Sequence, residues 1–311
     1  MSIYVQGRMV MSSPMWILKR MEYHSPVEQL IDRCSSWLSA ETISDSLPER
    51  LNIFAFLPNE VRKNSFISMS SVDQKMAMEK TGPYWHAYFT AFPDIRFVGA
   101  TQRRAHGVVT KDPEIHTPQD LVGKRIAVIP RPSSLRALQE IVLFKSWGIY
   151  DDVEIKEYLP QDMEPALENG EIDAMFLPVV SIVNGEARGR YIDLERDDLW
   201  WISLSVSDVS AAVEDTPILA ERVTITPPNG ATNGDREVGL ITRDSAYFTF
   251  AVTPDDVVYD FIQAMRFACP PGEEECEGLS MDTMLRWPEL TQSLVHPGAL
   301  KYYREQGVQF D

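Results

Sequence analysis

The sequence has 311 residues, of which 44% are apolar and 24% charged, a balance typical of a globular protein large enough for two lobes. Its net charge of −17 makes nucleic acid and an anionic membrane surface poor partners, so we expect neither, although a locally positive cleft can still take a small anion. No run of about 18 apolar residues is present, and we therefore expect no membrane span.

The start of the sequence has neither the apolar core nor the cleavage site of a secretory signal. The sequence as it stands predicts a cytoplasmic protein, or a periplasmic one if a signal peptide has been removed. The three cysteines, Cys34, Cys269 and Cys276, are an odd number, and only the last two are close enough in sequence to pair. Free thiols are the simpler interpretation. No Cys/His metal spacing is present, so we expect no metal and no other cofactor.

The first part of the chain predicts strands that alternate with helices. Val5–Leu18 is expected to form a strand, a loop and the start of a helix, and Leu51–Leu57 and Ser65–Met69 are expected to form further strands. Ser70 or Ser71 is then suited to N-cap a helix, because its hydroxyl can accept from the first backbone N–H groups.

Charged residues interrupt the apolar strand region Arg96–Thr110. Arg103, Arg104 and His106 can be surface arginines and a hydrogen-bonded histidine. Alternatively, one arginine holds an acidic group of a ligand through charge-assisted hydrogen bonds. His106, with an ordinary pKa near about 6.5, could then serve as a proton donor in an enzyme.

The segment from His116 to Val179 predicts one half of an α/β domain. It reads as a short helix, a strand, a loop, a long helix, a second strand, a third helix and a third strand. The polar loop Pro130–Ser134 lies between the first strand and the long helix. Ligands of open α/β sheets bind at that position, beyond the carboxyl ends of the strands.

Two functions are open for this loop. Ser133 or Ser134 is suited to N-cap the long helix. The same hydroxyls, the N–H groups of the helix start and Arg131 would together also suit an anion. Arg131 can hold a carboxylate through two parallel hydrogen bonds. Further along the chain, Glu237–Val252 predicts a strand and Pro254–Phe267 a helix.

Five segments resemble the TAXI family of solute receptors, the extracytoplasmic binding subunits of certain tripartite (TRAP) transporters. They are Thr117–Val128, Trp147–Ile149, Ala166–Phe176, Pro254–Tyr259 and His296–Gly307. The resemblance implies an α/β, two-lobed periplasmic-binding-protein-like fold of type II, with mixed sheets flanked by helices and a ligand cleft that closes by a hinge. Lobe one would comprise residues 1–102 and 237–311, and lobe two residues 103–236. A membrane transporter subunit would be a partner only of an exported protein.

The sequence departs from that family at both ligand loops. No glycine stands around residues 12–16, where the family has a glycine-rich loop, and the second loop reads Pro-Arg-Pro-Ser-Ser instead of glycine and serine. Side chains are therefore expected to hold the ligand. The residues expected to line the cleft are Ser12, Ser13, Trp16, Tyr84, Trp85, Arg103, Arg104, Arg131, Ser133, Ser134, Pro178 and Val179.

The preferred interpretation is a TAXI-like solute-binding protein whose partner is a small anionic organic ligand that contains a carboxylate. The alternative is a cytoplasmic enzyme on the same fold, a decarboxylase or another lyase acting on a carboxylic acid, with His106 as the catalytic proton donor. A weaker similarity to dihydroxyphthalate-type decarboxylases supports this alternative, although Arg104-Ala105-His106 is out of register with their Arg-His pair. No catalytic motif decides between the two.

Overall fold

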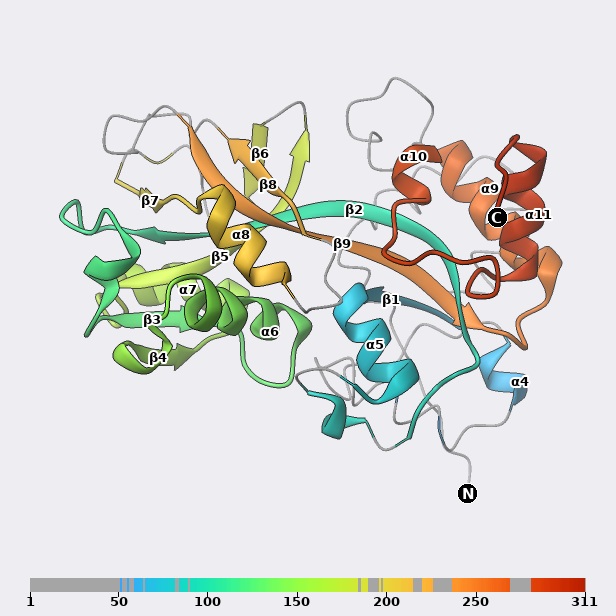
Figure 1. The fold of residues 1–311 in the computed structure, drawn as a ribbon, viewed down its shortest axis with the longest axis horizontal. Helices are drawn as coiled ribbons and strands as arrows, with labels where there is room; N and C mark the ends of the chain where they lie inside the picture. The colour runs from blue at the N-terminus through green and yellow to red at the C-terminus, as the bar shows by residue number, and fades with distance from the viewer. Residues whose placement is uncertain are drawn as a thin grey trace. The chain divides into compact units, whose positions relative to one another are not determined.

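The computed structural model describes residues 51, 55, 59–63, 65–81, 84–88, 90–183, 186–189, 196, 198–214, 220–225, 237–268 and 281–310. The predictions made for Val5–Leu18, including Ser12, Ser13 and Trp16, lie outside these residues, and so do the three cysteines. The chain divides into two compact units, one made of Met1–Gln102 and Ser245–Asp311 and the other of Arg103–Asp244. Strands and helices alternate in the chain, which confirms the predicted α/β class (Figure 1).

Two long strands supply residues to both units. They are β2 (Ile95–Thr110) and β9 (Val238–Phe250), and they are neighbours in the strand order β1-β9-β2-β5-β3-β4 (Figure 1). Every residue of β9 is buried. A strand covered on both faces must be mostly apolar, so its few charged residues need partners.

The first unit pairs a short strand with β9 and covers it with helices. Its further elements are α4 (Asn59–Arg62), β1 (Phe66–Ser70), α5 (Ser71–Glu79), η1 (Trp85–Ala87), α9 (Asp255–Ala268), α10 (Met281–Met284) and α11 (Pro297–Glu305). β1 runs antiparallel to β9, from Phe66 opposite Thr249 to Ser70 opposite Ser245. The strand predicted at Ser65–Met69 and the helix predicted after Ser70 are therefore confirmed.

Aromatic stacking holds α9 against this strand pair. The ring of Phe261 on α9 lies 4.0 Å from that of Phe66 on β1 and 5.4 Å from that of Tyr247 on β9. Such pairs stabilise a core by about 0.5–1.5 kcal/mol beyond the burial of their area. One prediction in this unit is not met at the two positions that the structure describes: of the strand expected at Leu51–Leu57, Leu51 is helical and Ala55 lies in a turn. A short apolar run does not distinguish a buried helix from a buried strand.

The second unit contains the βαβαβ arrangement that the sequence predicts. Its elements are η2 (Pro118–Leu121), β3 (Arg125–Val128), α6 (Ser134–Ile141), the π-helical turn η3 (Val142–Ser146), η4 (Tyr150–Asp152), β4 (Glu154–Glu157), α7 (Pro160–Glu168), β5 (Ala174–Val183), β6 (Glu186–Gly189), β7 (Trp200–Ile202), α8 (Val206–Val213) and β8 (Arg222–Ile225). β3 lies between β4 and β5 and is parallel to both, and α6 and α7 make the two crossovers (Figure 1).

The core of this unit lies between the sheet and α7. Side chains of β2, β3 and β5 pack there against Met163, Ala166 and Leu167 of the helix. The packing leaves no room at Gly107 of β2, where an added Cβ would stand 2.3 Å from Leu240. The glycine thus allows β2 to lie close against Leu240 of β9. The polar residues of these two strands are held in place by the same packing.

Candidate site at the start of helix α6

Helix α6 begins at the carboxyl end of β3, where the sequence predicts a ligand loop. Ser133 is the N-cap: its Oγ accepts from the backbone N–H of Leu135 at 3.2 Å. Ser133 is thus the N-cap, one of the two serines expected to cap this helix. The third helical position is occupied by Arg136, and the first turn contains no acidic residue. The positive end of the helix dipole is therefore not neutralised by a carboxylate of its own turn.

Ser134 joins this helix start to β9. Arg243, which is 8% exposed, donates from Nη1 to Ser134 Oγ at 2.8 Å, and Ser134 is itself 6% exposed. Because the hydroxyl accepts from the guanidinium, its own proton is available for another acceptor. The structure thus places a buried cation at the amino end of α6.

His106 on β2 is buried close to the same cation. It is 1% exposed, and within the described part of the chain neither ring nitrogen has a hydrogen-bond partner. A buried polar group left unmatched costs about 1–3 kcal/mol, so an imidazole held in this way favours any group that can pair with it.

Burial, together with two nearby arginines, keeps this histidine uncharged. Burial, followed by the positive charges of Arg243 and Arg104, lowers the pKa of His106 well below its ordinary range. Arg104 and His106 are two residues apart on β2, so their side chains leave the same face of the strand. Asp244 follows Arg243 on β9, and its side chain leaves the opposite face from that of Arg243. The group formed by Arg104, His106, Ser134 and Arg243, here called the basic site, is suited to an anion.

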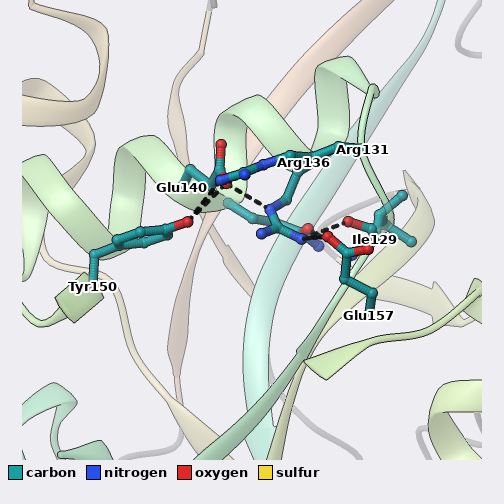
Figure 2. A network of polar contacts seen from close by, with 7 residues as sticks. Ile129, Arg131, Arg136, Glu140, Tyr150 and Glu157 are labelled. Atoms are coloured by element: carbon teal, nitrogen blue, oxygen red, sulfur yellow. Dashed lines mark hydrogen bonds and ion pairs between the residues drawn. The ribbon is translucent and has the colours of Figure 1, made fainter. Parts of the chain in front are cut away.

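Arg131 belongs to a different network, shown in Figure 2. Its Nε donates to Glu140 at 3.0 Å, and its Nη2 to the same carboxylate and, at 2.9 Å, to Tyr150. The side chain is 52% exposed. Arg131 therefore already holds a carboxylate of the protein.

The centre of that network is Arg136, which the sequence analysis did not single out. Its side chain is only 3% exposed and donates to Glu140, Glu157 and the carbonyl of Ile129, at 2.9, 2.9 and 3.0 Å (Figure 2). These bonds fasten the first turn of α6 to the end of β3 and to β4. The network fixes the loop that presents Ser133 and Ser134.

The other predicted ligand residues lie in several places. Arg103 is in β2, and Pro178 and Val179 are in β5, with Pro178 opposite His106 in the strand register. Tyr84 is buried in the first unit, whereas Trp85 is 44% exposed and lies under the ammonium group of Lys80. The structure thus brings together three predicted residues, Arg104, His106 and Ser134, and adds Arg243.

The sequence around Arg243 already marks this residue as unusual. It stands with Asp244 in the middle of the strand V-G-L-I-T-R-D-S-A-Y-F-T-F, which is otherwise free of charge. A charged residue in a fully buried strand is retained only with a partner or a function.

Among the described residues, no group of three His, Cys, Asp or Glu side chains is arranged to hold a metal ion. In the same part of the chain, no helix has the length and apolar character needed to cross a membrane.

Fold and site together define an α/β protein of two units with a buried cationic group at a helix start. Residues 67–307 match the NMT1-like family, and the chain belongs to that family.

Several solved structures are similar to this chain. The periplasmic binding protein BugD shares 11% identity at a TM-score of 0.49, with 90% of this chain and 86% of that chain covered. The alkanesulfonate-binding protein SsuA from Xanthomonas axonopodis pv. citri, bound to MOPS, shares 15% identity at a TM-score of 0.39 over 75% of this chain. Tv2483, bound to L-arginine, shares 15% identity at a TM-score of 0.33 over 55% of this chain. The chain spans 62% of the SsuA chain and 52% of the Tv2483 chain.

Proposed function

We propose that this chain is a solute-binding protein of the TAXI type and that its ligand is a small carboxylate bound at the start of α6. One observation carries the proposal: Arg243 is buried against Ser134 at a helix start that has no acidic residue in its first turn. A guanidinium forms strong charge-assisted hydrogen bonds to a carboxylate, and the amino end of a helix favours the same kind of group. An exported protein of this type would deliver its ligand to a membrane transporter subunit.

The basic site can bind a carboxylate with several groups at once. The guanidinium of Arg243 supplies charge-assisted donors, the hydroxyl of Ser134 supplies its proton, and α6 supplies its dipole. Hydrogen bonds to a charged group stabilise by about 1.5–3 kcal/mol each, and the helix end by about 0.3–1 kcal/mol. Arg104 adds a second positive charge near His106.

The remaining candidates contribute to the wall of the site in this proposal. Arg131 would reach a second acidic group of the ligand only by giving up Glu140 and Tyr150. Its net contribution is therefore smaller than that of Arg243. Ser133 acts mainly as the cap of α6, and Arg103, Pro178 and Val179 belong to the strands β2 and β5.

A ligand panel tests the proposal. Acetate, benzoate, succinate and adipate are compared with the uncharged amides of the same acids, by thermal unfolding and by calorimetric titration. At least one acid, and none of the amides, should raise the melting temperature. The Arg243→Gln variant should bind that acid about 100-fold more weakly, because a buried charge partner is lost. Arg131→Ala should weaken binding by less than about tenfold, and the exposed control Arg304→Gln should not change it.

Two outcomes would contradict the proposal. One is that no acid in the panel stabilises the wild-type protein more than its amide does. The other is that Arg243→Gln, shown by circular dichroism to be folded, binds the acid as tightly as wild type.

The enzyme alternative draws on the same buried histidine. A lyase that uses His106 as its proton donor needs the imidazolium form, and the lowered pKa keeps the unliganded residue neutral near pH 7. Long incubation with an acid that binds, followed by proton NMR, tests for turnover. Conversion of the acid would replace the binding proposal with the enzyme.

A further inference from the structure

His106 is the one residue of the basic site whose polar atoms have no partner within the described residues. Both ring nitrogens are buried without a hydrogen bond. A neutral imidazole offers one donor and one acceptor, whereas its protonated form offers two donors. An anion beside the ring is best matched by the protonated form.

The groups around His106 decide when it can take a proton. Arg104 stands on the same strand, Arg243 on β9 and Ser134 at the start of α6, whereas the side chain of Asp244 leaves the opposite face of β9. Pro178, its neighbour on β5, carries no ionisable group. The two arginines oppose a third positive charge while no ligand is present. An anion between them and the ring would offset this repulsion and favour a proton on the imidazole.

We propose that His106 binds the ligand directly and takes up one proton when an anion enters the basic site. The inference rests on the proposed function, since it requires an anion at the start of α6. The proton comes from the solvent and goes to a ring nitrogen, which then donates to the anion. The ligand thus binds as its anion, and one proton binds to His106 at the same time.

The sign of the pH dependence follows from this linkage. The free protein has a neutral His106 over the neutral pH range, and the complex has a protonated one. Binding therefore consumes a proton, and affinity increases as pH falls. The dissociation constant should change up to about tenfold per pH unit between the His106 pKa values of the free and bound states. Release is favoured by alkaline conditions.

The experiment is calorimetric titration of the wild-type protein with succinate, or with the panel acid that binds best. Titrations at several pH values between about 5.5 and 8 use pairs of buffers with different enthalpies of ionisation. The slope of binding enthalpy against buffer enthalpy gives the number of protons taken up. We expect a value approaching one at some pH in this range.

Two variants locate the proton. His106→Gln should keep measurable succinate binding but lose the proton uptake and most of the pH dependence. Ser205→Ala, at the capped start of α8 elsewhere in the unit, should keep both. Proton uptake that persists in His106→Gln would assign it to another group and overturn the inference.

The outcomes separate the inference from the function on which it rests. If no acid binds at any pH, the proposed carboxylate site itself fails. If an acid binds and Arg243→Gln weakens it, but no proton is taken up over the whole pH range, the proposed function stands and the role of His106 is wrong.

Discussion

The starts of α5 and α6 differ at the third helical residue, and we propose that this residue separates a structural cap from a binding site. Both follow a strand, and both begin with two serines: Ser70 and Ser71 in one, Ser133 and Ser134 in the other. In α5 the third helical residue is Asp73, whose carboxylate accepts from the N–H of Ser70 at 3.0 Å and from its hydroxyl at 2.7 Å. The helix start thus has its own anion.

In α6 the third helical residue is Arg136, and its side chain bonds away from the helix start, to Ile129, Glu140 and Glu157. The anion position of α5 has no equivalent in this turn, and Arg243 approaches Ser134 instead. Two other capped starts, at Thr117 and Ser205, repeat the aspartate of α5. A serine pair therefore predicts an N-cap. The charge of the third helical residue decides whether the helix start already has an anion of its own.

The largest effect is expected when α6 is given an anion of its own. Ser134→Asp places a carboxylate beside Arg243 and the helix dipole, where the proposed ligand would bind. Succinate affinity should fall by more than about 100-fold, because the counter-charge is already present. Calorimetric titration measures this loss.

The size-matched control for this variant is Ser134→Asn, which adds similar volume without charge. It should weaken succinate less than Ser134→Asp does. Equal losses in the two variants would mean that the basic site rejects bulk and not charge, and the comparison with α5 would lose its meaning.

A smaller effect is expected when α5 loses its anion. Asp73→Ala removes the acceptor for the N–H and hydroxyl of Ser70, which should cost about 1 kcal/mol of unfolding free energy. Succinate affinity should not change, because Asp73 serves the helix and not a ligand. Urea unfolding and titration measure the two quantities. A drop in affinity as large as that of Arg243→Gln would show that α5 also takes part in binding.

The sequence predicted the architecture better than the chemistry. Apolar periodicity between residues 116 and 179 gave the βαβαβ order, because burial on one face imposes the pattern locally. It also placed the two serines at a helix start. Sequence could not show that Arg131 is held by Glu140 and Tyr150, nor that Arg243 meets Ser134, since those pairs form only after strands and helices pack. Arg243 and Ser134 are 109 positions apart in the sequence, and such a contact has no local signature.

The smallest effect is a pH dependence of the unfolding free energy, which we expect His106 of the basic site to cause. His106 has a lowered pKa in the folded protein and an ordinary one, near about 6.5, when unfolded. Between these values the unfolded chain binds the extra proton, so the stabilisation by neutral His106 is complete above the unfolded pKa and declines as pH falls. Lowering pH from 7 to 6 should cost about 0.7 kcal/mol through this residue alone.

The measurement is the difference between wild type and His106→Asn in urea unfolding free energy at the two pH values. The variant should lose this part of the pH dependence, while Asp73→Ala should keep it, because α5 contributes no titrating histidine. Bound succinate should reduce the wild-type dependence as well, since the ligand makes the protonated histidine acceptable in the folded state. If His106→Asn keeps the full pH dependence of the wild-type unfolding free energy, His106 does not cause that dependence. The contrast between the two helix starts would then rest on Arg243 alone.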